Sequence, residues 1–222
     1  MRLLAIDTAT DACSAALHVD GAIIARHEIA PRQHAKLILP MIGSLLAESG
    51  LVTTQLDAIA FGRGPGAFTG VRIAVGVVQG IAFAADLPVV AVSDLAAIAV
   101  AAKRVHDAPL TLACLDARMR EVYWGIFDCE GQQPGPRGAE HLSAPDAVCT
   151  DIEVYAAGPG WSAYPAMAER LAPQLLGSDT TLLPHAADIA RIAVPMIERG
   201  ETTPAEQALP VYLRDEVAWK KA

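Results

Sequence analysis

Gly64-Pro65-Gly66-Ala67-Phe68-Thr69-Gly70-Val71-Arg72 is the stretch that decides the fold of this chain. It lies between a strand-like run at 58–62 and an apolar, helix-like stretch at 71–86, which is the pattern of a strand-to-helix turn. Glycine on both sides of Pro65 permits the positive φ of a sharp turn, because glycine has no side chain to clash. Thr69 is a residue type that often caps helices, so we expect it to be the N-cap of the helix that follows.

Arg72 is the unusual residue of this stretch. A cation in the first turn of a helix opposes the helix dipole at about 0.3–1 kcal/mol. We therefore expect a carboxylate, with Asp7 as a candidate, or a bound anion to compensate the charge. The alternative is a purely structural turn that fixes where the helix begins, with Arg72 in solvent. The spacing alone does not separate these interpretations.

The composition bounds the class of protein. The chain has 222 residues, is 53% hydrophobic and 5% aromatic, and carries a net charge of −8. A protein that binds tRNA by itself needs a cationic face, because phosphate neutralisation supplies most of the affinity. No run of basic residues is longer than Lys220-Lys221, so we expect only indirect contact with tRNA. A basic patch assembled in three dimensions stays open.

The sequence predicts a cytoplasmic protein that does not enter the membrane. The N-terminus meets Asp7 before an apolar signal region can form. The most apolar helical stretch, 73–85, is interrupted by Gln79 and is too short for about 30 Å of hydrocarbon. The four cysteines (13, 114, 129 and 149) form no C-x-x-C pair, which favours reduced thiols over a disulfide or a zinc site.

Hydrophobic periodicity predicts two halves that begin in the same way. The first half has the order βββαβαβα, with Asp20-Gly21 as a tight hairpin turn and Ser93 or Asp94 as a helix cap. Its predicted strands are 3–7, 14–19, 22–29, 58–62 and 88–92, and its predicted helices are 35–48, 71–86 and 95–104. After Pro109 the pattern restarts, with strands 110–115, 121–128 and 154–157, helices 161–171 and 186–199, and an irregular segment at 132–150.

Each half opens on an antiparallel hairpin whose first strand ends in an aspartate, Asp7 or Asp116. We therefore predict an α/β protein of two lobes, at 1–105 and 106–222, whose C-terminal segment is able to pack back on the first lobe. The repeated opening favours an internal duplication, although ordinary α/β periodicity could imitate it.

Four segments resemble the bacterial TsaB (YeaZ) family of tRNA threonylcarbamoyladenosine biosynthesis proteins. Residues 64–72 differ from the family signature GPGSFTGLR only by Ala67 and Val71. The other segments are 6–10 followed by Cys13-Ser14, 115–118 followed by 121–123, and 210–214. The resemblance implies the actin-like ATPase fold of Hsp70 and sugar kinases, in which two ribonuclease-H-like lobes face a cleft.

The resemblance also implies a function in tRNA modification. In the complex that this family forms, a TsaD-type subunit transfers the threonylcarbamoyl group to tRNA. A TsaE-type ATPase is a further member of the complex. The TsaB-type subunit is non-catalytic, and it forms a helical bundle with the TsaD-type transferase or with a second copy of itself. We therefore expect a subunit required for N6-threonylcarbamoyladenosine (t6A) formation that stabilises and activates the transferase. The rival interpretations are a small ATPase or kinase acting alone and a self-associating protein without a modification role.

The residues expected at the cleft are those that an actin-like kinase would use for a nucleotide. Two hydroxyls and the free N–H groups after Asp7 could hold an anion. In the second lobe, 116–120 lacks glycine and Pro159 removes a donor, so efficient ATP hydrolysis is not expected. No cofactor is expected to be required, and weak ATP or ADP binding is expected mainly in the assembled complex. The cleft set is Asp7, Thr8, Thr10, Gly64, Gly66, Thr69, Gly70, Arg72, Asp116, Gly158 and Gly160.

No catalytic residue and no metal site are expected. The TsaD-type motif H-x-x-x-H would present two imidazoles to a metal on one helical face. The six histidines (18, 27, 34, 106, 141 and 185) include no two that lie three to five residues apart. The chain also lacks G-x-S-x-G, H-E-x-x-H and a Walker lysine loop.

Two apolar helices supply the predicted partner interface. From 70 to 85 only Arg72 and Gln79 are strongly polar, and two glycines four apart would let another helix come close. The helix at 35–48 is apolar over a wide arc, with Pro40 bending it or marking a late start. Such faces mark an interface if they are exposed, unless the second lobe covers them. The predicted interface is His34 (alternatively a cap or surface residue), Leu37, Ile38, Met41, Ile42, Leu45, Ile73, Gly76, Val77 and Gly80.

Overall fold

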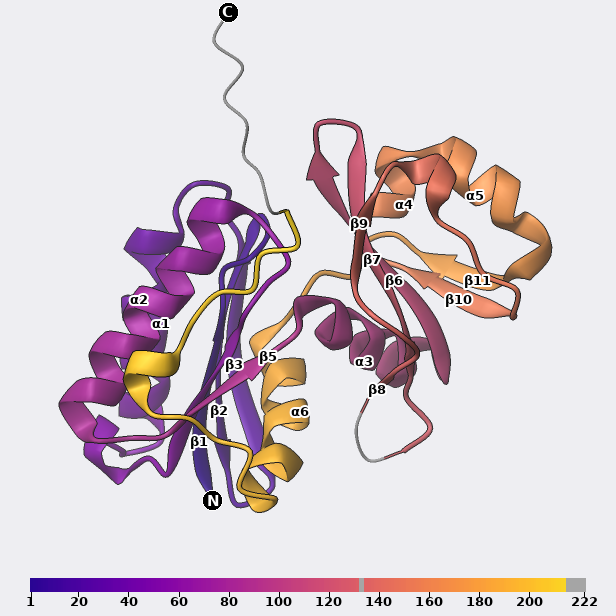
Figure 1. Cartoon of the computed structure of the whole chain (residues 1–222). Helices are drawn as coiled ribbons and strands as arrows, with labels where there is room; N and C mark the ends of the chain where they lie inside the picture. The colour runs from indigo at the N-terminus through magenta and orange to yellow at the C-terminus, as the bar shows by residue number, and fades with distance from the viewer. Residues whose placement is uncertain (132–133, 215–222) are drawn as a thin grey trace, which may run out of the picture.

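The computed structural model describes residues 1–131 and 134–214. In its first lobe five strands pair in the order β3-β2-β1-β4-β5 (Figure 1). They are β1 (Arg2–Asp7), β2 (Ala12–Val19), β3 (Ala22–Ile29), β4 (Ala58–Gly62) and β5 (Val89–Val92). The first three are antiparallel to one another, whereas β1, β4 and β5 run parallel and therefore end at the same edge of the sheet.

The second sheet repeats this plan. Its order is β11-β10-β6-β7-β8, with β9 also paired to β7. The strands are β6 (Leu110–Arg118), β7 (Glu121–Asp128), β8 (Gly135–Pro136), β9 (His141–Ser143), β10 (Val154–Ala157) and β11 (Leu175–Asp179). Here β6 takes the place of β1, with an antiparallel partner on one side and parallel strands on the other. The predicted repetition of the hairpin opening is confirmed at the level of topology.

Helices cover both sheets in three layers (Figure 1). The outer face of the first sheet packs against α1 (His34–Glu48) and α2 (Phe68–Ala85). Between the sheets lie α3 (Asp94–His106) and α6 (Ala186–Glu198), which share one apolar core with both lobes. On the far side, α4 (Gly160–Ala163) and α5 (Pro165–Leu171) cover the second sheet. Short 3-10 helices occupy Thr53–Gln55, Pro145–Ala147, Ala172–Gln174 and Ala205–Gln207.

The two middle helices exchange places between the lobes. Helix α3, from the first half of the chain, packs on β6, whereas α6, from the second half, packs on β1, β2, β4 and β5. Arg104 of α3 donates to both carboxylate oxygens of the buried Asp188 of α6, at 3.0 Å each. This exchange ties the two lobes together through a common core rather than through a linker.

Several predicted boundaries need correction. Helix α2 begins at Phe68 with Ala67 as its N-cap, so the prediction that Thr69 caps it is wrong. The helix starts earlier because the N–H of Val71 already donates to the carbonyl of Ala67. Helix α1 runs through Pro40 from His34, so the late start is wrong as well.

The second half departs from the predicted boundaries in two places. The predicted helix 161–171 is two helices, because Pro165 lacks the N–H that continuity requires. Sequence reasoning missed β11 altogether, and it missed β8 and β9 in the segment predicted to be irregular. Gln132, where that segment begins, lies outside the described residues.

Helix α3 agrees with its sequence signals. The hydroxyl of Ser93 accepts from the N–H of Ala96 at 3.2 Å, which selects Ser93 over Asp94 as the cap. Three basic residues occupy its last turn, where they complement the helix dipole.

Helix α2 is longer than the sequence predicted. Its 18 residues make it, among the described residues, the one helix with the length and apolar composition to cross a membrane. The prediction that its length excludes this is therefore wrong. Its inward face, which includes Val71, Val75 and Val78, packs in the core of the first lobe.

Candidate functional site

Two aspartates meet where the parallel strands of the first sheet end. Asp7 is the last residue of β1, and Asp94 follows the end of β5 by two residues. Both side chains are wholly buried and lie against each other, and one oxygen of each, Oδ2 of Asp7 and Oδ1 of Asp94, has no donor among the described residues. Gly62, the last residue of β4, lies between them, and a Cβ atom there would overlap an oxygen of each carboxyl group. The strand ends thus provide room for this pair only because residue 62 has no side chain.

The Asp7–Asp94 pair is held by backbone donors. Asp7 Oδ1 accepts from the N–H of Ala9 at 3.1 Å, and Asp94 Oδ2 accepts from the N–H of Gly64 at 2.6 Å. Burial raises the pKa of Asp7 to about 6. Burial and the facing carboxylate of Asp7 hold the pKa of Asp94 well above its usual range. Two carboxyl groups this close cannot both ionise at low cost, so the pair keeps a proton near neutral pH.

The signature stretch docks on the turn that follows Asp7. The hydroxyl of Thr8 donates to the carbonyl of Gly70 at 2.7 Å, and the N–H of Ala67 donates to the carbonyl of Ala9 at 2.7 Å. A Cβ atom on Gly70 would overlap the carbonyl oxygen of Thr8, and one on Gly66 would lie 2.5 Å from the carbonyl oxygen of Ala9. Because these two glycines have no side chain, the backbone of the signature stretch can pack closely on the backbone of the turn after Asp7.

Gly64 supplies the positive φ that the sequence predicted, at 98°. Beside it, the N–H of Val211 donates to the carbonyl of Arg63 at 2.8 Å, so the C-terminal segment crosses the signature stretch. The hydroxyl of Thr10 accepts from the N–H of Ala12 at 3.3 Å. Of the groups predicted to hold an anion, the hydroxyl of Thr8 and the N–H of Ala9 thus make internal hydrogen bonds.

Arg72 is compensated by aromatic rings rather than by an acid. Its guanidinium lies 3.3 Å from the ring centre of Phe68 and 5.2 Å from that of Tyr212. Within residues 1–131 and 134–214 it forms no ion pair, and the predicted contact with the buried Asp7 is wrong. Cation–π contacts of this kind stabilise an exposed cation by roughly 0.5–1 kcal/mol, which is comparable to the dipole penalty.

The second lobe uses its predicted cleft residues for packing. Asp116 accepts from the N–H of Arg118 at 2.8 Å, from the guanidinium of Arg118 at 3.1 Å and from the hydroxyl of Tyr164 at 3.3 Å. Gly158 has a φ of 100°, and a Cβ atom there would overlap the carbonyl oxygen of Cys114. A Cβ atom on Gly160 would overlap the sulfur of Cys114. Both glycines let the turn after β10 pack closely on β6.

These contacts do not fit a metal–nucleotide site. Asp7, the residue that would face a metal, is wholly buried and lies against a second carboxyl group. The hydroxyl of Thr8 is engaged by Gly70, and the glycines of the second lobe contact protein rather than open space. Among the described residues, no three His, Cys, Asp or Glu side chains are grouped so as to hold a metal ion.

The predicted interface separates into buried and accessible residues. The prediction is wrong for the members whose side chains lie in the core of the first lobe and cannot meet a partner: His34, Ile38, Ile42 and Leu45. Other members are half-buried on the outward side: Leu37, Met41, Ile73 and Val77. Gly76 and Gly80 are exposed, with open space where a Cβ atom would be.

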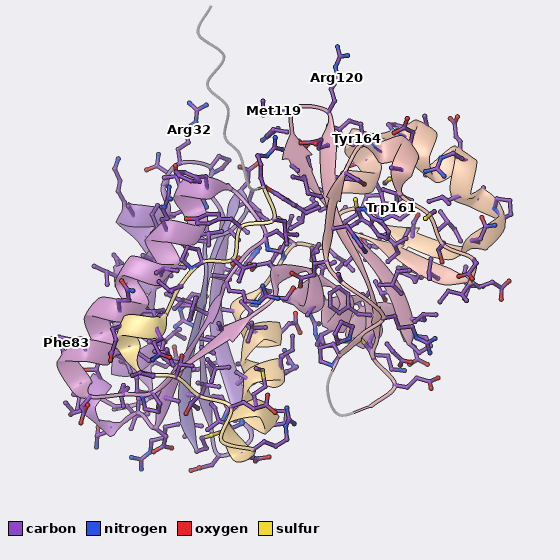
Figure 2. All side chains as sticks on the ribbon, in the orientation of Figure 1. Arg32, Phe83, Met119, Arg120, Trp161 and Tyr164 are labelled. Carbon is purple, nitrogen blue, oxygen red and sulfur yellow. The ribbon has the colours of Figure 1, made fainter. Side chains whose placement is uncertain are left out.

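Sequence reasoning missed three residues of consequence. Phe83 on α2 is 82% exposed, and its spacing of seven from Gly76 could have placed it on the same face (Figure 2). Asp94 was considered only as a cap. Arg63 contacts both carboxylate oxygens of Glu140 at 3.2 Å across the two lobes, and no local signal predicts that pair. Lys220-Lys221 lies outside the described residues.

Comparisons with known proteins agree with this architecture. The family model described as "TsaD: tRNA N6-adenosine threonylcarbamoyltransferase" matches residues 26–221. "tRNA threonylcarbamoyladenosine biosynthesis protein TsaB" of Escherichia coli is 43% identical over 232 positions, which cover 100% of this chain and 98% of that protein. The protein of the same name from Haemophilus influenzae is 42% identical, with coverage of 100% and 97%.

A solved structure shows the same arrangement of both lobes. "YeaZ from Pseudomonas aeruginosa" superposes with a TM-score of 0.88 at 46% identity, and covers 96% of this chain and 99% of that one. The repeated sheets and this match define an actin-like α/β fold built from two ribonuclease-H-like lobes. More narrowly, the chain belongs to the TsaB (YeaZ) family.

Proposed function

We propose that this chain is a non-catalytic subunit required for t6A formation in tRNA. It stabilises and activates a TsaD-type transferase by packing α1 and α2 against it in a helical bundle. Its relatives are named for threonylcarbamoyladenosine biosynthesis, which supports the pathway. The further partners are a TsaE-type ATPase and a second copy of this chain, and the compartment is the cytoplasm.

The observation that carries the proposal is the outward face of α2. Gly76 and Gly80 leave open space four residues apart, and Phe83 stands exposed beside them. The second lobe does not cover this face, because it lies on the other side of the first sheet (Figure 1). An exposed aromatic residue next to small residues suits close packing with a helix of another subunit.

The buried Asp7–Asp94 pair supports the non-catalytic part. An actin-like ATPase needs a carboxylate that can reach a metal–nucleotide, whereas Asp7 is enclosed and shares a proton with Asp94. No cofactor is required in this proposal. Weak ATP or ADP binding is confined to the assembled complex, where a partner supplies further contacts. Because the net charge is −8, the chain does not bind tRNA on its own.

Reconstitution tests the proposal. A TsaD-type subunit, a TsaE-type ATPase, tRNA and substrates are combined with and without this chain, and t6A is quantified by mass spectrometry. We expect t6A to form only when the chain is present, and no ATP turnover by the chain alone. Equal t6A in both reactions, or rapid ATP hydrolysis by the isolated chain, contradicts the proposal.

Gly76→Leu locates the interface. A leucine there meets no atom of its own chain within 4 Å at Cβ, so the monomer should fold normally. We expect it to abolish both the complex with the TsaD-type subunit and the pair of identical copies, measured by analytical ultracentrifugation. Ala166→Leu, at an exposed position of α5, is the matched control and should leave both assemblies intact. Assembly of the Gly76→Leu chain at wild-type affinity places the interface elsewhere.

A further inference from the structure

The turn between β6 and β7 is built from residues that its backbone does not favour. Arg118, Met119 and Arg120 all have positive φ, at 60°, 54° and 63°. Arg118 lies at a register shift of the hairpin, and the next two residues form its two-residue loop. Glycine and asparagine are the usual residues at such positions, because other side chains clash in this conformation. Three successive exceptions suggest that the side chains themselves are needed.

Polar contacts beneath the turn hold it in this conformation. Asp116 accepts from the N–H and the guanidinium of Arg118. From the C-terminal segment, Arg214 donates to the carbonyl of Ala117 at 3.1 Å and pairs with Glu121 at 2.7 Å. These contacts come from three separate segments and fix the base of the turn, and at the tip Arg214 also contacts the sulfur of Met119 at 3.1 Å.

The tip is displayed to solvent. Met119 is 73% exposed, and Arg120 is exposed and points away from the second lobe (Figure 2). Within the described residues, Arg120 forms no hydrogen bond or ion pair. The structure thus holds an arginine in solvent at a conformational cost while giving it no partner of its own.

The first lobe presents a similar residue on the same side. Arg32, between β3 and α1, has a φ of 65°, is exposed and also has no ion pair within the described residues. It points outward at the same end of the molecule as Arg120 (Figure 2). The neighbouring acid is Asp11, whose carbonyl accepts from the N–H of Ala30 in the same loop, and its carboxylate does not pair with Arg32.

We propose that this arginine edge, defined as Arg32, Met119 and Arg120, contacts the phosphate backbone of RNA bound to the assembled complex. The inference rests on the proposed function, which brings the chain to a tRNA. A guanidinium binds phosphate through two parallel hydrogen bonds, and arginines set on two lobes can follow a strand of phosphates. The net charge of −8 over the whole chain keeps the isolated chain from binding RNA, so the edge acts only beside a partner.

RNA suits the edge better than an acidic protein. A protein partner would need an apolar, desolvated centre around the arginines, whereas Met119, the apolar member of the arginine edge, is 73% exposed. Phosphate contacts need no such centre, because they are made at the solvated surface.

The test measures tRNA affinity of the reconstituted complex over a range of salt concentrations. With Arg32→Glu and Arg120→Glu together, we expect at least a tenfold loss of tRNA affinity. The slope of log affinity against log salt concentration should also become less steep, by the amount that corresponds to about two phosphate contacts. Arg2→Glu, at the opposite end of the molecule, is the matched control and should leave affinity unchanged (Figure 1). Unchanged affinity and salt dependence in the double variant overturn the proposal.

A crosslinking measurement separates the two kinds of partner. With a photoreactive amino acid in place of Met119, irradiation of the complex should capture labelled tRNA. Capture of a protein subunit without tRNA, or loss of complex assembly in the charge-reversed chain, overturns the RNA assignment in favour of a protein contact. These readouts concern binding, so they stay distinct from t6A yield, which tests the proposed function itself.

Discussion

Asp7 ends β1 and Asp116 lies two residues before the end of the equivalent strand β6, yet their surroundings are opposite. Asp7 is wholly buried against a second carboxyl group, whereas Asp116 is partly exposed and braces a hairpin turn. The difference follows from where a glycine-rich turn docks on each strand. In the first lobe, Gly66 and Gly70 pack on Ala9 and Thr8, just beyond the aspartate.

In the second lobe the docking point lies earlier on the strand. Gly158 and Gly160 pack on Cys114, two residues before Asp116. The uncovered strand therefore continues to Arg118, and β6 has nine residues where β1 has six. A shift of a few residues in one packing contact thus accounts for the difference between the two lobes. The first lobe has an enclosed carboxyl pair at this place, and the second has an exposed, arginine-bearing hairpin.

Gly70→Ala should have the largest effect of the variants, and it tests the packing that encloses Asp7 in the first lobe. The new methyl group overlaps the carbonyl oxygen of Thr8, so either the backbone moves or the Thr8 hydroxyl bond to Gly70 is lost. We expect the free energy of unfolding to fall by about 3 kcal/mol, measured by urea denaturation. Gly76→Ala on the same helix is the control and should gain roughly 0.5–1 kcal/mol, because its Cβ atom meets nothing. Equal midpoints for Gly70→Ala and wild type would show that the docking contact is not tight.

The carboxyl pair predicts a dependence of stability on pH. The folded pKa of Asp7, about 6, exceeds its usual value of 3.8, and the pKa of Asp94 is also raised well above that value. At this pair the folded state therefore binds more protons than the unfolded state, so the contribution of the pair to stability falls as pH rises from about 4 through 6 and beyond. The stacked His27 and His185 contribute in the opposite direction, because burial lowers the pKa of each. His34 and Arg63 also face the pair and lower the cost of its ionised form.

Asp94→Asn should flatten this dependence. The amide can donate to Asp7 and accept from Gly64, so it reproduces the protonated Asp94 without its charge. We expect a gain on the order of 1 kcal/mol at pH 8 and a smaller gain at pH 5, measured by denaturation across pH. Asp116→Asn removes the equivalent carboxylate of the other lobe and should not change the pH profile in this way. An Asp94→Asn profile with the same slope as wild type between pH 5 and 8 contradicts the shared proton.

Local signals in the sequence were sufficient for the elements and the order of the first lobe and for the hairpin that opens the second, but not for β8, β9 and β11. The Asp20-Gly21 turn and the Ser93 cap are confirmed, with positive φ at both turn residues and a side-chain bond at the cap. These features depend on neighbours within a few positions, so their residue types carry the information.

The Asp7–Asp94 pair could not be predicted in the same way. It brings together residues 87 positions apart in sequence, and no motif near either aspartate indicates that the other lies beside it. The buried residues of α1 were assigned to the interface because a helix that is apolar over a wide arc does not reveal which arc meets its own sheet. The aromatic stack on Arg72 depends on Tyr212, which arrives from the far end of the chain.

The smallest expected effect comes from the exposed β6–β7 hairpin, and it gives the sharpest contrast with the counterpart in the first lobe, the β2–β3 hairpin. Replacing Met119 by asparagine and Arg120 by glycine supplies residues that adopt positive φ without strain, so the free energy of unfolding should rise by about 1 kcal/mol. The β2–β3 turn already has Asp20 and Gly21, at φ of 48° and 93°, and Asp20→Asn should change stability little. If the relaxed hairpin is more stable while the complex binds tRNA more weakly, the strain is retained for the side chains it displays. If the complex with the relaxed hairpin binds tRNA as tightly as the wild-type complex does, then tRNA binding does not explain why the strain is retained.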